Sequence, residues 1–404
     1  MQPLPMLTDR PSATDPGRAH LTARIKDHAR AAGFDVVGIA AATPFGPARA
    51  ALLERIASGY LSGLGWFTAA RAEFSSDPAN LLSGARSIVA VAMSYAAEAP
   101  PAPATPGRPR GRVARYAGGH DYHDVFKRRL AALVEAIEVE CHAAGAVSGG
   151  AESYRTLVDT ARIVDRAAAA RAGVGWYGKN TNIITTGPAG SWVLLGEVLT
   201  VLDLEPDTPL RKHCGACDLC LRACPTGAIV SPYVLHSDRC ISYLTIEHRG
   251  VIPRDLRPLI GAWVFGCDIC QEVCPPNARP TAAPGGHAEF QPLDADLAAP
   301  DLIALLEISQ QEFSDRFRHS PIKRAKRDGL RRNAAVALGN SGDPAAVPAL
   351  ARALNDPSPL VRGHVAWALG RLGGALAPAA LAARLIVEQD PQVREELTLA
   401  LVAV

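Results

Sequence analysis

The cysteines between Cys214 and Pro275 constrain this chain more than any other part of the sequence. The run opens as Cys214-Gly-Ala-Cys217-Asp-Leu-Cys220-Leu-Arg-Ala-Cys224-Pro225, the C-x₂-C-x₂-C-x₃-C-P spacing of bacterial-type iron–sulfur proteins. In such proteins three cysteines of the run hold one cluster, and the cysteine before the proline serves a second cluster. The sequence therefore predicts a domain built around two clusters.

Eight cysteines divide into two sets of four, and each set is predicted to hold one [4Fe–4S] cluster. The first set is Cys214, Cys217, Cys220 and Cys274, and the second is Cys224, Cys240, Cys267 and Cys270. Structural zinc is the alternative, because C-x₂-C pairs also bind zinc. The C-x₃-C-P crossing between the two sets favours iron–sulfur, since zinc sites do not require it.

The overall composition limits the class of protein. A chain of 404 residues is long enough for two or three domains. Eight cysteines in cluster spacing indicate a reducing compartment, and the ninth, Cys141, is expected to be a buried apolar residue. The N-terminus has no basic segment followed by an apolar core, and no apolar stretch is long enough to cross a bilayer. We therefore expect a soluble cytoplasmic protein without membrane contact.

The order of predicted elements indicates three regions. Strands and helices alternate irregularly over residues 19–205, which predicts an α+β domain. Residues 1–18 are expected to form a disordered tail, residues 206–285 the di-cluster domain, and residues 286–404 a linker and helical repeats. Strands are predicted at 34–40, 87–95 and 192–202, and helices at 20–32 and 161–172. A further helix is predicted from the helical spacing of the apolar residues Phe126, Leu130, Leu133, Val134 and Ile137.

The C-terminal part repeats itself. Leu338-Gly339 recurs as Leu369-Gly370, and Leu330-Arg331 recurs as Val361-Arg362 and Val393-Arg394, at intervals of 31 and 32 residues. Asp-Pro turns at 343–344, 356–357 and 390–391 separate the helices. This pattern indicates short helical repeats of HEAT type, which bind bulky partners along one face.

Two stretches imitate other binding motifs. Residues 173–180, Gly-Val-Gly-Trp-Tyr-Gly-Lys-Asn, match G-x-G-x-x-G and nearly match a P-loop. A dinucleotide loop needs a strand before it and a helix after it, the reverse of the order here, and a P-loop needs Ser or Thr where Asn180 stands. Residues 121–126, Asp-Tyr-His-Asp-Val-Phe, imitate the D-x-H-x-x-G signature of histidine-ligated cobalamin. Phe126 replaces the glycine, so cobalt ligation by His123 is not expected.

Together these features resemble the epoxyqueuosine reductase family, over about residues 19–404. The motifs are the cluster run, Gly-His-Asp-Tyr-His123, Val-Asp159-Thr, Gly-Trp-Tyr-Gly-Lys179-Asn180 and Arg239-Cys240-Ile-Ser-Tyr-Leu-Thr245. The resemblance implies an oxidoreductase that reduces epoxyqueuosine to queuosine at the wobble position of tRNA, the last step of queuosine biosynthesis. It also implies cobalamin and two [4Fe–4S] clusters, held by a nitroreductase-like N-terminal domain and a ferredoxin-like domain.

By the resemblance, Asp159 is the acid that protonates the departing epoxide oxygen. Such an acid must keep its proton at neutral pH, which burial against cofactor and substrate favours. Without the resemblance, Asp159 is equally well explained as the cap of a following helix. The family match makes His123 and Asp121 supporting catalytic positions. The residues implied to line the cobalamin are Lys179, Asn180, Ser242, Cys267 and Asp268.

A local basic run is the expected tRNA-binding surface. Residues 316–332 hold eight Lys or Arg against one acid, although the net charge of the whole chain is only +2. A solvated helix face is the other interpretation. The expected contacts with anticodon-stem phosphates are Lys323, Arg324, Lys326, Arg327, Arg331 and Arg332. We also expect an external electron donor and a monomeric enzyme.

Two other functions fit parts of the sequence. A reductive dehalogenase-like reductase of small molecules would use the same cofactors, but such proteins usually carry an export signal and lack a helical-repeat tail. A ferredoxin-type electron carrier leaves the N-terminal domain without a role. One stretch, Phe74-Ser75-Ser76, departs from the epoxyqueuosine reductase pattern, because many members carry a basic residue before the following Asp-Pro. That departure puts one cobalamin contact in doubt.

Overall fold

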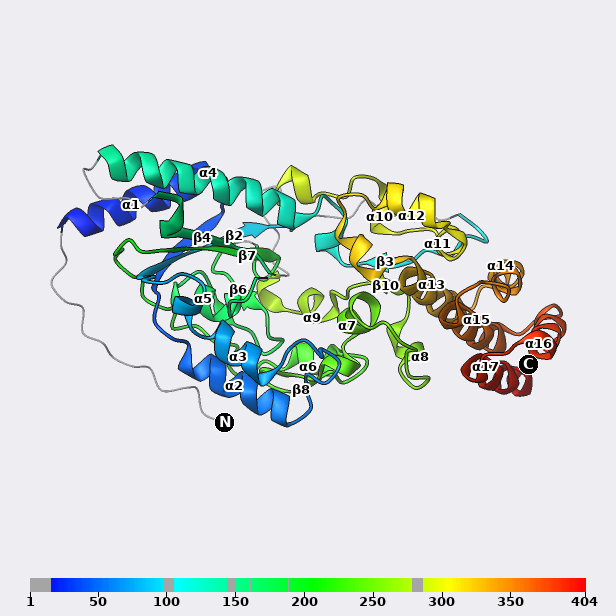
Figure 1. The fold of residues 1–404 in the computed structure, drawn as a ribbon. Coiled ribbons are helices and arrows are strands. Elements are labelled where there is room, and N and C mark those ends of the chain that lie inside the picture. Colours follow the sequence, from blue (N-terminus) through cyan, green and yellow to red (C-terminus); the bar gives the residue numbers. More distant parts are fainter. Residues whose placement is uncertain (1–15, 97–104, 144–149, 160, 188, 278–285) are drawn as a thin grey trace.

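The chain forms three regions in a row in the computed structural model, which describes residues 16–96, 105–143, 150–159, 161–187, 189–277 and 286–404 (Figure 1). A mixed α+β region lies at one end, the cysteine-rich segment in the middle and the helical repeats at the other end. Among the described residues, no helix is both long and apolar enough to cross a membrane.

A four-stranded antiparallel sheet organises the first region. Its strand order is β1-β2-β7-β4. The strands are β1 Val36–Ala41, β2 Ser87–Ser94, β7 Val193–Thr200 and β4 Tyr154–Leu157. Every residue of β2 is buried, because helices cover both faces of the sheet. The predicted strands at 34–40, 87–95 and 192–202 are therefore confirmed to within two residues.

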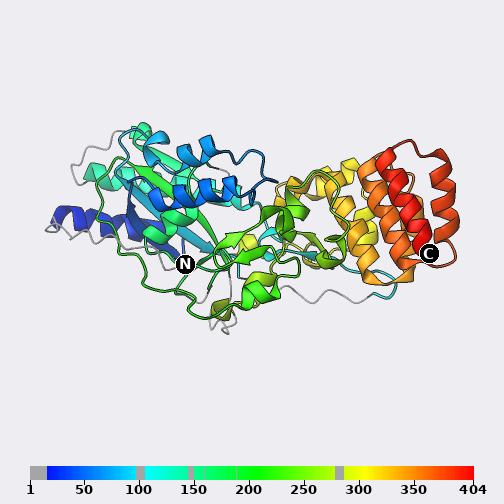
Figure 2. The same cartoon turned by 90° about the horizontal axis from the view of Figure 1, so that it is seen from below.

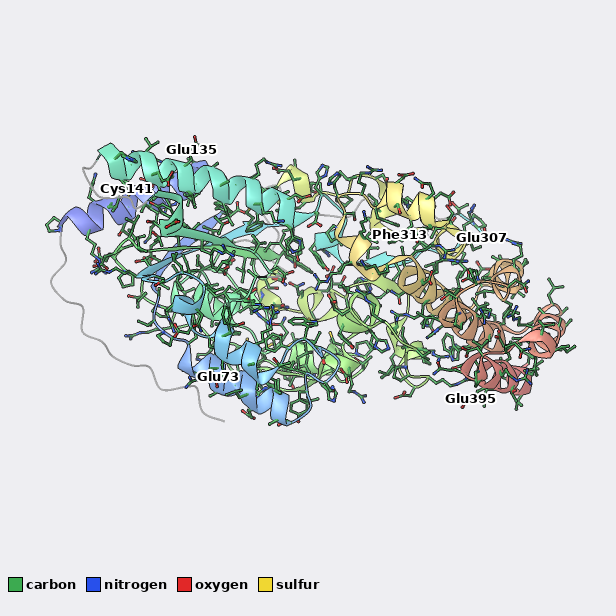
Figure 3. All side chains as sticks on the ribbon, in the orientation of Figure 1. Glu73, Glu135, Cys141, Glu307, Phe313 and Glu395 are labelled. Carbon is green, nitrogen blue, oxygen red and sulfur yellow. The ribbon has the colours of Figure 1, made fainter. Side chains whose placement is uncertain are left out.

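Two long helices, α1 Pro16–Ala31 and α4 Tyr122–Ala143, pack on one face of the sheet. Phe126, Leu130, Leu133 and Ile137 of α4 are fully buried there, as predicted, and Cys141 is buried near the end of α4 (Figure 3). The predicted disordered tail is wrong for residues 16–18, which belong to α1. The Arg18 guanidinium anchors this first turn by donating to the Leu204 carbonyl oxygen at 2.7 Å. Residues 1–15 lie outside the described residues.

The opposite face of the sheet carries α5 Asp165–Arg171, with α2 Gly46–Ala57 and α3 Ala69–Ser75 beyond it. The helix predicted at 161–172 is shorter than expected, because the loop after β4 continues to Val164. Residues 173–180 contribute β5 Trp176–Tyr177, which pairs with β6 Ile183–Ile184 in a short hairpin. Residues 173–180 therefore follow a helix and lead into a hairpin, which is the setting of neither a dinucleotide-binding loop nor a P-loop.

The cysteine-rich segment is built from short elements. These are α6 Leu219–Ala223, β8 Ile229–Ser231, β9 Val234–Leu235, α7 Ile241–Ile246, α8 Arg257–Ile260, β10 Trp263–Phe265 and α9 Ile269–Glu272. Strand β10 pairs in parallel with β3 Arg112–Val113, which comes from the first region. Ion pairs reinforce this link, because Arg112 pairs with Glu272 at 2.6 Å and Arg108 pairs with Asp301 at 3.0 Å. The regions are therefore joined by contacts between distant parts of the chain.

Helices make up the remainder of the chain. They are α10 Ala295–Ala298, α11 Leu302–Glu307, α12 Gln310–Arg316, α13 Arg327–Ser341, α14 Val347–Ala353, α15 Pro359–Leu372, α16 Ala377–Val387 and α17 Pro391–Ala403. The 3-10 turns are η1 Pro78–Asn80, η2 Arg115–Ala117, η3 Gly150–Ser153, η4 Ser237–Arg239, η5 Pro275–Asn277, η6 Ala288–Phe290, η7 Pro321–Ala325 and η8 Pro344–Ala346.

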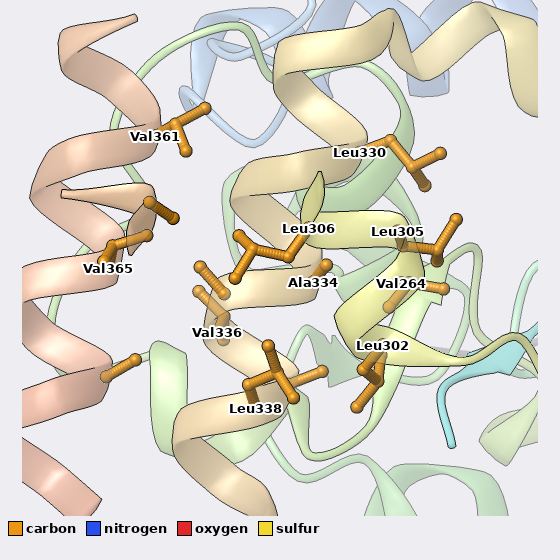
Figure 4. Packing of buried hydrophobic residues seen from close by; sticks show 14 of the residues in the cluster. Val264, Leu302, Leu305, Leu306, Leu330, Ala334, Val336, Leu338, Val361 and Val365 are labelled. Carbon is orange, nitrogen blue, oxygen red and sulfur yellow. The ribbon is translucent and has the colours of Figure 1, made fainter. Parts of the chain in front are cut away.

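The repeat prediction is confirmed by the stacking of α13, α15 and α17, seen side by side in Figure 2. Leu306 of α11, Leu338 of α13 and Val365 of α15 share one buried core (Figure 4). The recurring glycines allow the backbones of the stacked helices to approach closely. A Cβ at Gly370 would lie 2.9 Å from the Ala400 Cα, so only glycine fits without movement of α17.

Gly370→Ala is expected to lower the stability of the repeats by about 1–3 kcal/mol, because the added methyl group overpacks a backbone contact. The matched control is Gly329→Ala in α13, where a Cβ meets nothing within 4 Å. That change is expected to be neutral or to stabilise by up to about 1 kcal/mol, since alanine loses less backbone entropy on folding. Thermal unfolding of both variants measures the difference. Equal destabilisation by both would show that α17 does not pack closely at Gly370.

Candidate active site

Asp159 lies in the loop that follows β4, with φ at +39°, a backbone conformation that is uncommon outside glycine. Its carboxylate accepts a hydrogen bond from the Tyr122 hydroxyl, and its side chain is 50% exposed. The next helix described, α5, begins at Asp165, so Asp159 does not cap it. The loop therefore presents the carboxylate to solvent beside the first turn of α4.

The start of α4 brings the other predicted catalytic residues to Asp159. His123 Nδ1 lies 2.8 Å from Asp121 Oδ1, and His123 Nε2 lies 3.6 Å from Asp159 Oδ2. The Asp121 carboxylate also accepts from the His123 amide at 2.9 Å. Tyr122 stacks on the imidazole, with ring centroids 4.2 Å apart. The structure thus brings Asp121, His123 and Asp159 together, as the sequence predicted.

The electrostatics of this cluster act in opposite directions on the pKa values of Asp121 and Tyr122. Burial opposes the charge on Asp121, but hydrogen bonds from the His123 imidazole and amide lower the pKa of Asp121 overall. Asp121 is therefore the stable anion that orients the imidazole. Burial and the charge of Asp159 raise the pKa of Tyr122, so its phenol stays protonated and donates to Asp159.

Distant segments hold the start of α4 in place. The His120 amide donates to the Glu289 carbonyl oxygen at 2.8 Å, and the Asp121 amide donates to the His319 carbonyl oxygen at 2.7 Å. A Cβ at Gly119 would lie 2.4 Å from the Glu289 oxygen, so a larger residue would displace that segment. The geometry around Asp159 therefore depends on the C-terminal part of the chain.

The eight cysteines lie close enough to affect one another's ionisation. Burial and the charges of Cys214, Cys220 and Cys217 raise the pKa of Cys274 to about 12. Burial likewise raises the pKa of Cys270, and charges on Cys240, Cys267, Cys220 and Cys224 act in the same direction. Cys270 is therefore affected by cysteines of both predicted sets. Among the described residues, no three His, Cys, Asp or Glu side chains converge tightly enough to hold a single metal ion.

The residues implied to line a cofactor border the cysteine loops. Lys179 Nζ donates to the carbonyl oxygens of Gly215 at 2.7 Å and Cys217 at 2.9 Å, and the Asn180 amide donates to the Cys270 oxygen at 3.2 Å. The β5–β6 turn therefore contacts loops of both sets.

Ser242 and Asp268 each lie within two residues of a cysteine of the second set. Ser242 is partly buried in α7, two residues after Cys240. Asp268 is 2% exposed and accepts from the Arg115 amide at 2.8 Å. Burial raises the pKa of Asp268 to about 6 despite that hydrogen bond. Ser75 and Ser76, in the stretch that departs from the family pattern, are also buried.

The basic run divides into exposed and buried residues. Lys323, Arg324 and Lys326 are exposed around η7, and Arg327 is partly exposed beside Asp328. The prediction of phosphate contacts is wrong for Arg331 and Arg332, which are 5% and 1% exposed.

Both buried arginines are structural. Arg331 pairs with Asp356 of the next repeat, and Arg332 donates to carbonyl oxygens of Leu244, His248 and Gly250. Arg362, at the repeat position equivalent to Arg331, pairs in the same way with Glu388 at 2.7 Å. The 31-residue recurrence was the signal for this structural role.

Two residues of the site were not predicted. Tyr122 stands between Asp121 and His123, and only the three-dimensional structure reveals its hydrogen bond to Asp159. Glu197 is 1% exposed on β7, where it faces the α5 side of the sheet. A carboxylate within the apolar run Trp192–Leu202 was a visible signal in the sequence.

Sequence profiles of three families match the chain. "Epoxyqueuosine reductase QueG, DUF1730" matches residues 76–160, "4Fe-4S double cluster binding domain" matches residues 213–277, and "HEAT repeats" matches residues 322–402. The cluster-domain match decides in favour of iron–sulfur over structural zinc.

Individual proteins match over nearly the whole chain. An epoxyqueuosine reductase of Pseudomonas aeruginosa is 41% identical over 382 residues, covering 92% of this chain and 99% of that protein. A crystal structure of epoxyqueuosine reductase with an epoxyqueuosine-modified stem loop of tyrosine tRNA superposes with a TM-score of 0.86 at 36% identity, covering 95% of this chain and 98% of that one. The Bacillus subtilis enzyme, in a structure with its catalytic aspartate loop swung out of the active site, gives 0.86 at 35% identity over 95% and 99%.

Proposed function

The chain belongs to the epoxyqueuosine reductase family, and from that premise we propose how its residues carry out the reaction. It is an oxidoreductase that reduces epoxyqueuosine in tRNA to queuosine. The dehalogenase-like and electron-carrier alternatives are set aside, because neither accounts for 41% identity to an epoxyqueuosine reductase over 92% of the chain. The observation that carries the residue roles is the cluster of Asp159, Tyr122 and His123.

The reaction sets what the residues must supply. Removing the epoxide oxygen as water breaks two C–O bonds and forms an alkene, and it consumes two electrons and two protons. The iron–sulfur domain at residues 213–277 provides the electron entry, fed by an external donor. Our assignment of its eight cysteines to two sets is supported by their spacing and, for the first set, by the effect of Cys214, Cys217 and Cys220 on the pKa of Cys274. The protons must come from acids beside the substrate.

Asp159 is the acid in this proposal, because it is the exposed carboxyl group of the cluster. The Tyr122 hydroxyl fixes its orientation by hydrogen bonding to one oxygen. His123 is held by Asp121 so that Nε2 faces Asp159 at 3.6 Å, and this nitrogen is buried without a hydrogen-bond partner among the described residues. An imidazole in this position returns a proton to the carboxylate between turnovers. Asp121 and His123 therefore support Asp159.

Cobalamin fits the residues around this site. The indole N–H of Trp176 and both carboxyl oxygens of Glu197 are buried without hydrogen-bond partners among the described residues. Both residues lie on the α5 side of the sheet, and the amide groups at the rim of cobalamin can donate to and accept from such atoms. Lys179, Asn180, Ser242, Cys267 and Asp268 would hold the cofactor beside the second cysteine set. When bound, cobalamin supplies a two-electron nucleophilic centre, and the first region would then be a nitroreductase-like cobalamin domain.

The exposed part of the basic run is the proposed tRNA contact. Lys323 and Lys326 are exposed, and Arg324 pairs with Glu247 while its side chain stays 40% exposed. Burial opposes the effect, but the charges of Glu247 and Asp159 raise the pKa of Arg324, so this guanidinium lies within electrostatic reach of the catalytic acid. The run therefore leads from the repeats to the active site, where it can position phosphates next to the modified nucleotide.

Replacing Lys323 and Lys326 together by glutamine should weaken tRNA binding and reduce its dependence on salt. Each lost phosphate contact removes about 0.7–0.9 from the slope of log affinity against log salt, so we expect roughly 1–2 for the pair. Binding measured across a salt series gives the slope. The matched control is Arg30→Gln with Arg49→Gln, two exposed arginines of α1 and α2.

The same pair of variants separates tRNA positioning from chemistry. Turnover of epoxyqueuosine within tRNA should fall in the lysine variant, while turnover of the free nucleoside should not, because a nucleoside presents no row of phosphates. If both substrates respond alike, the exposed basic run is a solvated surface.

The domain boundaries at 205/206 and 285/286, a cytoplasmic location and a monomeric state remain part of the proposal.

A further inference from the structure

Glu197 is a buried carboxyl group that no part of the mechanism described above uses as an acid. It lies on the central strand β7, is 1% exposed, and neither carboxyl oxygen has a hydrogen-bond partner among the described residues. Burying an unpaired carboxylate costs several kcal/mol or more, so a carboxyl group in such a place is stable only in its neutral form. A neutral carboxylic acid holds a proton that it can donate.

The groups that face Glu197 reinforce this state. Its partners across the sheet are Ala90 on β2 and Leu157 on β4, which are apolar. The charged groups that act on it among the described residues are Asp165 in the first turn of α5 and Asp159 after β4. Burial first, and then the negative charges of Asp165 and Asp159, raise the pKa of Glu197 well above its ordinary value.

The cation next to Asp165 is Arg166, and its side chain is directed away from Glu197. Arg166 donates to the Thr181 carbonyl oxygen at 2.9 Å, and its side chain is 48% exposed. It lies 3.8 Å from the Asp165 carboxylate, and its charge is not among those that act on Glu197.

The register of the sheet places Glu197 near the catalytic acid, Asp159. It sits directly opposite Leu157, and the two side chains point to the same face. Asp159 follows Leu157 by two residues, in the loop just beyond the end of β4, and its charge acts on Glu197. A water molecule or a polar ligand group between the two carboxyl groups can carry a proton from one to the other.

The reduction of the epoxide requires two protons, and the exposed carboxyl group of Asp159 holds one at a time. We propose that Glu197 is kept as a neutral carboxylic acid and supplies, through Asp159, the second proton of the reduction. Asp159 gives the first proton to the epoxide oxygen as the first C–O bond breaks. The O–H bond of Glu197 then breaks, its proton passes to the Asp159 carboxylate, and Asp159 delivers it to the oxygen that leaves as water. The electrons enter through the clusters from the external donor. This inference rests on the proposed function.

The transfer is favourable overall because of the final acceptor. This acceptor is the departing hydroxide oxygen, which is a much stronger base than any carboxylate. His123 faces Asp159 from the α4 side at 3.6 Å and reaches solvent more readily, so it restores protons between turnovers. Glu197 acts within a turnover, when substrate covers the exposed side of Asp159. Glu197 is thus a proton-supplying residue that acts through Asp159.

The test uses the full-length enzyme and Glu197→Gln, which keeps the shape and neutrality of the acid but has no acidic proton. In the infrared spectrum of the wild type at neutral pH, we expect the carbonyl band of a protonated carboxylic acid, and this band should be absent from the variant. Turnover of the variant should fall by at least roughly tenfold. Wild-type turnover should also decline as the pH rises through ionisation of Glu197, and the variant should lack that decline. Glu135→Gln, an exposed change on α4, is the matched control (Figure 3).

A stability measurement gives a reading that needs neither substrate nor cofactor. Because the folded-state pKa of Glu197 is raised, the unfolded chain ionises first as the pH rises above about 4.3, and the wild type loses stability over that range. Glutamine has no such loss. The Tm of Glu197→Gln minus that of the wild type should therefore widen with rising pH. Glu197→Met, of similar volume and equally without a proton, serves if the glutamine variant folds poorly.

The proposal is overturned if the wild type has no protonated-carboxyl band at neutral pH that depends on Glu197. It is also overturned if the pH profile of turnover is unchanged in the variant while cobalamin binding weakens, because Glu197 would then only hold the cofactor. Failure of the proposed function itself looks different. In that case the wild type would not reduce epoxyqueuosine in tRNA at all, while the infrared band and the Tm difference would persist.

Discussion

Asp159→Asn is expected to lower turnover of epoxyqueuosine in tRNA by roughly 10²-fold or more, the usual contribution of a general acid. Asparagine keeps the size of the side chain and can still accept from the Tyr122 hydroxyl, so the loop should keep its conformation. It cannot give a carboxylic proton to the departing oxygen. Single-turnover assays under anaerobic conditions measure the chemical step directly.

The control for this prediction is Tyr122→Phe, which removes the hydrogen bond to Asp159 but leaves the carboxyl group. We expect a smaller loss of turnover than in Asp159→Asn, because the tyrosine orients the acid and does not replace it. Iron content, cofactor binding and tRNA affinity should be unchanged in both variants. Near-normal turnover in Asp159→Asn would contradict the assignment and move the role of acid to another group, with Glu197 and His123 as the candidates.

Pairs of cysteine replacements should divide the iron content in a way that depends on which set they belong to. The enzyme purified without oxygen should hold about eight irons in two clusters. Replacing Cys220 and Cys274 by alanine removes two ligands of one cluster, so about four irons should remain. Replacing Cys220 and Cys224, which are only four residues apart, removes a ligand from each cluster, so both clusters should be weakened or lost. Iron analysis and electron paramagnetic resonance give the result.

The control for these variants is Cys141→Ala, which should keep all the iron, because Cys141 is buried in the core of the first region. Epoxyqueuosine reduction should be lost in every cluster variant, since electrons reach the active site through the clusters. If the pair Cys220 and Cys274 loses both clusters while the pair Cys220 and Cys224 keeps one, the division into sets is wrong.

Much of this fold could be predicted from the sequence, because many of its features depend on local sequence patterns. The cysteine spacing, the β1, β2 and β7 strands and the Leu-Gly recurrence each depend on neighbours a few residues away or on a regular repeat. Their positions were therefore predicted correctly. The shortened α5 was not, because the loop that carries Asp159 extends to Val164.

The parts that were missed depend on contacts between distant residues. Arg331 and Arg332 have the same charge as Lys323 and Lys326, and only the packing of α13 against the neighbouring helices buries the arginines. Likewise, the alignment of His123 with Asp159 requires the His319 and Glu289 carbonyl oxygens to fix the start of α4. Neither arrangement follows from local pattern, since the buried arginines bond residues up to 88 positions away and the start of α4 bonds residues more than 150 positions away.

The parallel pairing of β3 with β10 has a consequence for synthesis of the chain. Arg112 of β3 pairs with Trp263 of β10, about 150 residues later. At a translation rate of about 5–20 residues per second, roughly 8–30 s pass before the partner of β3 leaves the ribosome. During that time β3 and its neighbouring arginines are without their partners Glu272 and Asp301. The active site therefore cannot be completed by the nascent N-terminal region alone, and a ribosome that stalls before β10 releases a fragment with an unpaired strand edge, open to aggregation.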